Sequence, residues 1–455
     1  MEEKNSRRYD VVIVGGGVSG TALFYTLSKY TNIKRVALLE KYDRLALVNS
    51  NYSSNSQTLH FGDIETNYTL EKATKVKAAA EMVRRYVEAE KKRGVKKKLF
   101  TLYHKMVLAV GDEQVDELER RYEEFKGLFP EAKLLNREEI AKVEPKVIEG
   151  RDKNQKLLAL FSPNGYTMDY RALSESFAEN ALEISKKKKT RFELFLNIKL
   201  LKIERADNGF KIYTNNGVFT CDVAIISAGG HSLLIAKSLG YGKDFSILSV
   251  AGSFYFVPKA LNGKVYTMQI KKLPFAAIHG DPDVHDQSKT RFGPTAKVIP
   301  LLERYNYSSF FEYFKTFGFG IRQIVSLFRI LSDWTVLKYI VTQFMYDMPI
   351  IGKGLFLREV RKVVPSVKLS DLEFAKKTGG TRPQIINLKT KKLDLGEAKI
   401  LGEKCIFNIT PSPGASTCLR NSYEDTKKIM EFFGGRFMFM EKEFRKELVD
   451  WNLHK

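Results

Sequence analysis

The chain has 455 residues, of which 44% are hydrophobic, and its formal charge is +22. This length exceeds what one core usually serves, so we expect two domains or one large domain with an insertion, and the apolar content excludes a disordered chain. The three cysteines, Cys221, Cys405 and Cys418, form no CxxC pair, which argues against a metal site or a disulfide framework and favours a reducing compartment.

Residues 9–40 have the pattern of one dinucleotide-binding unit. Residues 11–14 have strand composition, residues 22–30 are helix-like, and residues 36–39 form a second strand ending at Glu40. Between the first strand and the helix stands a GxGxxG motif, formed by Gly15, Gly17 and Gly20. These glycines permit a tight turn, a close approach to a pyrophosphate, and close packing of helix on strand. Glu40 is placed to accept hydrogen bonds from ribose hydroxyls, so the unit predicts an adenine dinucleotide.

The uncharged stretch 11–28 follows three basic residues and could be mistaken for a signal peptide or a membrane span. Asp10 and four glycines argue against both readings. No other segment offers ~18 uncharged apolar residues, so we expect neither a signal peptide nor a transmembrane helix.

The middle of the chain alternates between helical and sheet patterns. Residues 70–126 are rich in helix formers around a strand-like stretch at 101–110, and residues 192–220 alternate as antiparallel strands do. A buried-strand run at 223–226 ends in the small-residue turn 227–230. We assign Ala228 and Gly229 of this second turn to cofactor binding.

From residue 249 to residue 365 the character changes to strands and a long aromatic helical region, and turn-rich sequence returns at residues 379–383. This order predicts an α/β fold. A Rossmann-like nucleotide domain is assembled from residues 1–90, 150–245 and 376–436. An inserted antiparallel-sheet substrate domain with helices takes 91–149 and 246–375. Residues 437–455 form a C-terminal tail.

Residues 310–331 are predicted to form one amphipathic helix, rich in phenylalanine on one face and carrying Lys315, Arg322 and Arg329 elsewhere. Such a helix suits an anchor in a membrane interface, but packing on the protein core explains the same pattern. The high positive charge likewise fits an anionic substrate, an anionic membrane or a lysine-rich surface. No RNA- or DNA-binding motif is present, so we expect no nucleic acid as partner.

Six motifs together resemble one family almost end to end. They are NSQTLH (55–60) with ETNYT (65–69), FAAIHG (275–280) with RFGPTA (291–296), RPQII (382–386) and SPGAST (412–417). The chain resembles the FAD-dependent superfamily of D-amino-acid oxidase and glycerol-3-phosphate dehydrogenase, and within it the shorter-chain malate:quinone oxidoreductases. The resemblance implies a peripheral enzyme on the cytoplasmic side of the membrane that oxidises (S)-malate to oxaloacetate in the citric acid cycle and reduces quinone.

This chemistry needs a base and cationic anchors for the dicarboxylate substrate. His279 follows an apolar strand and has a reference pKa near ~6.5, so we expect it to be the base. Arg382 and Arg291 are the expected carboxylate anchors, because the guanidinium fork matches a carboxylate. Gln57 and His60 are expected to contact the substrate or the flavin.

The same resemblance extends the predicted cofactor site. Asn55 and Ser56 are assigned to FAD, as are Gly414 and Ala415, whose N–H groups precede a helix and suit the charge that develops on a reduced flavin. The N-terminal motif alone excludes neither NAD nor FAD. The second turn, the C-terminal segment and the resemblance favour FAD.

Two alternatives stay open. Because the His279 block is shared with 2-hydroxyglutarate dehydrogenases, another 2-hydroxy acid is a possible substrate. A basic flavin-binding or RNA-associated protein without enzyme activity is the non-enzymatic alternative.

Overall fold

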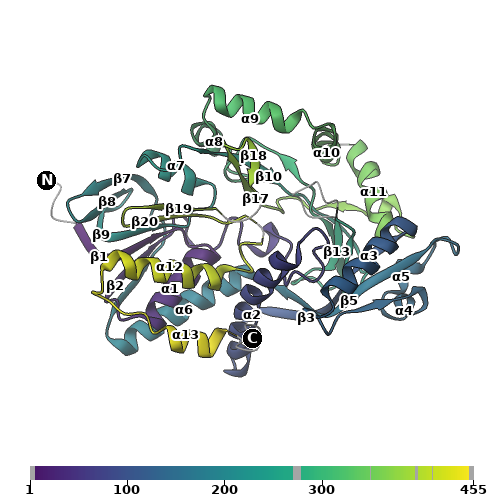
Figure 1. The fold of residues 1–455 in the computed structure, drawn as a ribbon, viewed down its shortest axis with the longest axis horizontal. Helices are drawn as coiled ribbons and strands as arrows, with labels where there is room; N and C mark the ends of the chain where they lie inside the picture. The colour runs from purple at the N-terminus through teal and green to yellow at the C-terminus, as the bar shows by residue number, and fades with distance from the viewer. Residues whose placement is uncertain (1–5, 270–277, 349, 395–397, 412, 450–455) are drawn as a thin grey trace.

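The computed structural model describes residues 6–269, 278–348, 350–394, 398–411 and 413–449 and confirms the α/β class (Figure 1). Its first layer is an eight-stranded sheet with a parallel core in the order β20-β9-β1-β2-β6. These strands are β1 (Ser6–Val14), β2 (Arg35–Leu39), β6 (Arg191–Phe195), β9 (Gly217–Ile226) and β20 (Cys405–Ile409). The antiparallel strands β7 (Leu200–Ala206), β8 (Gly209–Thr214) and β19 (Ala398–Gly402) complete it.

Both faces of this sheet are buried, which explains its continuous apolar runs. Val11 and Ile13 point into one core cluster and Val12 and Val14 into another, as the period of two requires. The first face is covered by α1 (Val18–Tyr30), α6 (Tyr170–Lys188) and α12 (Cys418–Phe433). The second face packs on the strands β7 and β8 and on α7 (His231–Ser238).

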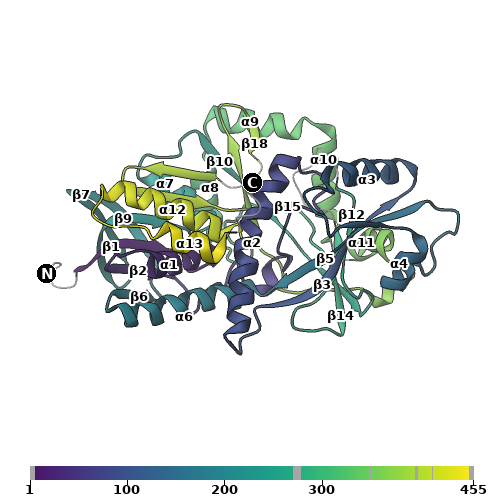
Figure 2. The ribbon, with the colours of Figure 1, turned by 60° about the horizontal axis from the view of Figure 1, so that its bottom comes forward.

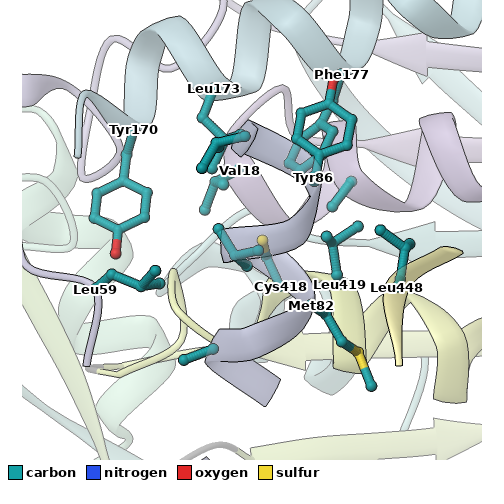
Figure 3. Packing of buried hydrophobic residues seen from close by; sticks show 14 of the residues in the cluster. Val18, Leu59, Met82, Tyr86, Tyr170, Leu173, Phe177, Cys418, Leu419 and Leu448 are labelled. Atoms are coloured by element: carbon teal, nitrogen blue, oxygen red, sulfur yellow. The ribbon is translucent and has the colours of Figure 1, made fainter. Parts of the chain in front are cut away.

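A further helix layer lies outside α12. There α2 (Leu70–Lys92) packs on α12 and on α13 (Glu441–Leu448), and Phe444 of α13 contacts Tyr423 of α12. Figure 3 shows Tyr86 of α2 beside Phe177 of α6. The ring centroids of these two residues are 4.5 Å apart. In the region expected to be a tail, Phe444 is fully buried, whereas residues 450–455 lie outside the described part.

The second layer is an eight-stranded mixed sheet on the opposite side of α2 (Figure 2). In sheet order its strands are β16 (Glu373–Phe374), β11 (Tyr255–Pro258), β14 (Lys289–Gly293), β13 (His279–Pro282), β12 (Lys264–Thr267), β3 (Phe100–Val110), β5 (Leu157–Met168) and β4 (Lys133–Leu135). The strand β5, which falls within 150–245, pairs with β3, which falls within 91–149. The partition into domains stays a prediction.

Short helices surround the second sheet. They are α3 (Asp112–Phe125), α4 (Arg137–Val143), α5 (Pro145–Ile148) and α11 (Ile351–Val363), with 3-10 turns at Tyr52–Ser54 and Leu369–Asp371. A third sheet of four strands contains β15 (Lys297–Val298), β10 (Phe245–Ala251), β17 (Thr381–Asn387) and β18 (Lys392–Asp394). The strand β17 carries Arg382, and β10 lies in the chain between β9 of the first sheet and β11 of the second.

The single helix expected at 310–331 is wrong, because Gly318 and Gly320 divide it. Two helices result, α8 (Ser309–Phe317) and α9 (Ile321–Leu331), and Gly318 has a φ of 77°. They have different surroundings: Phe317 of α8 is buried, whereas Ile321 and Phe328 of α9 are 83% and 75% exposed. The next helix, α10 (Trp334–Met345), continues along the same edge of the molecule (Figure 1). Within the described ranges, no helix has the length and apolarity needed to cross a bilayer.

Candidate active site

A cavity of about 510 Å³ runs along the carboxyl ends of the parallel strands. Its lining extends from Glu40 to the C-terminal turn at residues 413–416. The predicted site residues that line it are Gly15, Gly17, Glu40, Asn55, Ser56, His60, Ala228, Gly229, Arg382, Gly414 and Ala415. Four others do not line it: Gly20, Gln57, His279 and Arg291. Ligands of open parallel sheets bind at this end of the strands.

The glycine turn fits the phosphates of a dinucleotide. Gly15 has a φ of 113°, and a Cβ there would lie 2.3 Å from the backbone oxygen of Ser227. A Cβ on Gly20 would lie 2.0 Å from the backbone oxygen of Gly15, so Gly20 packs helix on strand rather than contacting a ligand. Gly17 precedes α1 and has no side chain to cap it, and the N–H of Val18, the first residue of the helix, donates to Oγ of Ser50 at 3.1 Å. Val18 and Ser50 line the cavity, so the N-terminus of α1 meets the cavity where an anion is favoured.

Glu40 stands where a ribose is expected. Its Oε2 accepts from the backbone N–H of Gly16 at 2.7 Å and its Oε1 from that of Tyr42 at 3.0 Å. Burial raises the pKa of Glu40, and these two hydrogen bonds counteract the rise. The carboxylate is therefore held in place by backbone groups and borders the cavity.

Two further turns close the cavity. Ser227 donates its N–H to the Val14 oxygen, which joins the second turn to the end of β1. In the C-terminal turn, Gly414 donates its N–H to the Pro411 oxygen at 2.7 Å. That amide is used within the turn, so the expected role of Gly414 in stabilising flavin charge stays a prediction. The helix that follows begins at Cys418.

His60 and Arg382 are two titratable side chains in the lining of the cavity. The Nδ1 of His60 is hydrogen-bonded to Oε1 of Glu65, which is 4% exposed. Burial lowers the pKa of Arg382, and the neighbouring Tyr339 acts in the opposite direction. In the parts of the chain that the structure describes, no carboxylate forms an ion pair with Arg382.

Beneath the cavity lies a row of buried charges on four adjacent strands of the second sheet. Lys105 of β3 lies opposite Lys264 of β12 in the strand register, and Asp281 of β13 lies opposite Arg291 of β14. Lys264 also links these two pairs of neighbouring strands, because its Nζ lies 3.4 Å from Oδ2 of Asp281. All four side chains are at most 2% exposed.

This row supports the cavity wall from behind. Arg291 donates to the backbone oxygen of Asn55 at 3.1 Å, and Lys264 donates to Oγ1 of Thr58 at 3.2 Å. Burial lowers the pKa of Lys264 to about 8, although Asp281 partly offsets this effect. The sequence analysis predicted no role in the site for Lys105, Lys264 or Glu65. For the two lysines, the signal in the sequence was a charged residue within a strand-like stretch.

The remaining predicted residues also lie behind the wall. Gln57 is fully buried, and its amide donates to the Tyr52 oxygen and accepts from the Val284 N–H. His279 is 1% exposed and stacks on Tyr266, with ring centroids 4.3 Å apart. Residues 275–277 of its motif lie outside the described residues.

The fold is that of a class of dinucleotide-binding oxidoreductases. It is similar to L-alpha-glycerophosphate oxidase from Mycoplasma pneumoniae, with a TM-score of 0.65 at 18% identity, covering 93% of this chain and 95% of that one. Glycine oxidase from Geobacillus kaustophilus gives a TM-score of 0.63 at 17% identity, with the same coverage.

Within that class, the chain belongs to the malate:quinone oxidoreductase (Mqo) family, whose model matches residues 7–431. It is 42% identical to a probable malate:quinone oxidoreductase of Campylobacter jejuni, over 98% of this chain and 100% of that protein. It is 40% identical to malate:quinone oxidoreductase of Helicobacter pylori strain 26695, over 97% and 98%. The expected family is thus confirmed.

Proposed function

We propose that the protein oxidises (S)-malate to oxaloacetate with FAD as cofactor and passes the electrons to a membrane quinone. The observation that carries this proposal is one cavity that joins the glycine turn and Glu40 to Arg382, in a chain of the malate:quinone oxidoreductase family. FAD supplies the hydride acceptor when bound. Gly15, Gly17 and Glu40 hold its pyrophosphate and ribose.

Arg382 is the proposed anchor for a substrate carboxylate. It borders the cavity, and no carboxylate in the described residues pairs with it. A guanidinium partly removed from water binds a carboxylate strongly because its planar fork offers two parallel hydrogen bonds. Arg291 already pairs with Asp281 at 3.0 Å, so Arg291 is better suited to supporting the wall. The role of His279 as base stays a prediction.

Contact with an anionic membrane through α9 and α10 is the second part of the proposal. Their exposed apolar side chains are Ile321, Ile324, Val325, Phe328, Trp334, Val341 and Phe344. Arg322, Arg329 and Lys338 are exposed on the same two helices. Apolar groups that enter the acyl boundary beside cations that meet acidic headgroups are the signature of an interfacial helix. This contact would bring the protein to a lipid-soluble quinone.

An anaerobic titration of the purified holoenzyme tests the proposed reaction. Malate is expected to bleach the visible absorbance of oxidised flavin, and a soluble quinone analogue, but not NAD, is expected to restore it. Equal or better reduction by 2-hydroxyglutarate would replace malate with that substrate. A flavin that no 2-hydroxy acid reduces would refute the enzymatic proposal.

A further inference from the structure

The imidazole of His60 lies between the cavity and a buried carboxylate. Its Nδ1 is 2.5 Å from Oε1 of Glu65, and its backbone N–H donates to Oγ of Ser416 at 2.9 Å. Ser416 belongs to the C-terminal turn at the far end of the cavity. Within the described residues, no hydrogen bond reaches Nε2 of His60, so this nitrogen is the one left to a ligand.

Glu65 is charged at this position. Burial alone would raise its pKa, but the hydrogen bond with His60 and the nearby charge of Lys105 hold the pKa of Glu65 below its usual value. A carboxylate accepts hydrogen bonds and cannot donate them, so it selects the tautomer with the proton on Nδ1. The lone pair of the neutral ring then lies on Nε2, and the carboxylate stabilises the imidazolium once Nε2 takes a proton.

The other histidines are less suited to meet a substrate. Among those that the structure describes, only His231 also borders the cavity, and its Nε2 is bound to Glu312 at 2.9 Å. His231 lies near Glu303, which pairs with Lys41 beside the ribose residue Glu40, so it belongs to the opposite end of the cavity. His279 does not border the cavity.

We propose that His60 is the proton acceptor in the oxidation and that Glu65 is its positioning residue. This inference rests on the proposed oxidation of a secondary alcohol. The C–H bond breaks and its electron pair leaves with the hydrogen as a hydride to the bound flavin. The O–H bond breaks and its proton passes to Nε2 of His60, while the carbon–oxygen double bond forms. The positive charge that arises on the ring is balanced by Glu65.

Stopped-flow reduction of the holoenzyme by malate tests the inference. Replacing His60 with Ala is expected to slow flavin reduction by about 10²- to 10⁴-fold, the usual contribution of a general base. Binding of malonate, a dicarboxylate with no hydroxyl to oxidise, is followed through the flavin spectrum and is expected to change less than about threefold. Free imidazole is expected to restore part of the rate in this variant.

Glu65 and a second histidine–carboxylate pair provide the controls. Glu65→Gln is expected to slow reduction while malonate binding persists, and Glu65→Asp is expected to recover part of that loss. His104 pairs with Glu144 at 2.8 Å on β3, away from the cavity, so His104→Ala is the matched control and should reduce at the wild-type rate.

Two results would overturn the inference. One is a wild-type rate of flavin reduction in His60→Ala. A slow rate of flavin reduction in His279→Gln would then assign the base to His279. The other is a loss of malonate binding equal to the loss of rate, without imidazole rescue, which would make His60 a binding residue. Failure of the proposed function is seen separately in the wild type: if another 2-hydroxy acid reduces its flavin, the variants are compared with that acid.

Discussion

Asp281 and Arg291 face each other on β13 and β14, and their side chains meet at 3.0 Å in an interior that leaves both at most 2% exposed. Burial alone would raise the pKa of Asp281, but the positive charges of Arg291 and Lys264 outweigh it and hold the pKa below its usual value. The carboxylate therefore stabilises the fold at neutral pH, and this stabilisation is lost only as the pH falls below about 4.

Removing that carboxylate should be costly. Asp281→Asn leaves two buried cations without their shared partner, so the free energy of unfolding is expected to fall by about 3 to 5 kcal/mol in urea denaturation. Glu71→Gln breaks the exposed pair with Lys75 and is the control, with no measurable change expected. A loss in Asp281→Asn as small as in the control would mean that water reaches the charged row.

Lys264 should make stability depend on alkaline pH. Because burial lowers its pKa to about 8 from 10.5, the folded state releases this proton before the unfolded state does. The unfolding free energy of the wild type should therefore rise relative to that of Lys264→Met between about pH 8 and 10.5, by on the order of 3 kcal/mol. Urea denaturation at several pH values measures the difference, and parallel curves would contradict the shift.

Gly15→Ala should abolish flavin binding. The added Cβ would stand 2.3 Å from the Ser227 oxygen in a backbone conformation that L residues rarely adopt, so the phosphate turn must open. The flavin content of the purified protein is the measurement. Gly354 of α11 has no atom within 4 Å of its Cβ position, and Gly354→Ala should retain full flavin.

Arg382→Lys should weaken malate binding more than it slows reduction. A lysine keeps the positive charge but loses the two-pronged contact with a carboxylate, at a cost of about 1 to 3 kcal/mol, or roughly five- to 150-fold in Kd. Reductive stopped-flow traces at several malate concentrations separate the two effects. A slower limiting rate at unchanged affinity would remove Arg382 from substrate binding.

Membrane contact should depend on the exposed face of α9. Replacing Ile324 and Phe328 with Asp is expected to release the holoenzyme from liposomes that contain phosphatidylserine, because both side chains are more than half exposed and neither supports the core. Sedimentation with the liposomes measures binding. The surface substitution Leu102→Asp, on β3, should leave binding unchanged, and retention of the double variant would exclude α9 as the anchor.

The sequence predicted the nucleotide-binding unit closely because local chemistry determines it. The glycines, the apolar strand residues and Glu40 act within about thirty residues, and β1, α1 and β2 end at the expected residues, although β1 and α1 begin earlier than expected. The division of the 310–331 helix depends on local chemistry too, since Gly318 and Gly320 flank a single residue, but the regular spacing of phenylalanines masked that signal.

The rest of the site arises from strand pairing over long separations. Lys105 and Lys264 are 159 positions apart and come together only through the register of β3 and β12. Neither residue alone indicates that its side chain is buried beside Asp281, since a lysine in a strand is usually placed on a solvent-facing surface. His279 had the right residue type for a base, but whether a strand-end side chain meets a cavity or a packed interior depends on the loops above it.

The strand β20 (Cys405–Ile409) pairs with β9 in the first sheet, and α12 (Cys418–Phe433) packs beside α1. The turn that closes the far end of the cavity lies between them. The N-terminal strand therefore needs residues about 400 positions further along the chain to complete the cavity that it borders, so the lining is complete only once that late segment has folded onto the sheet.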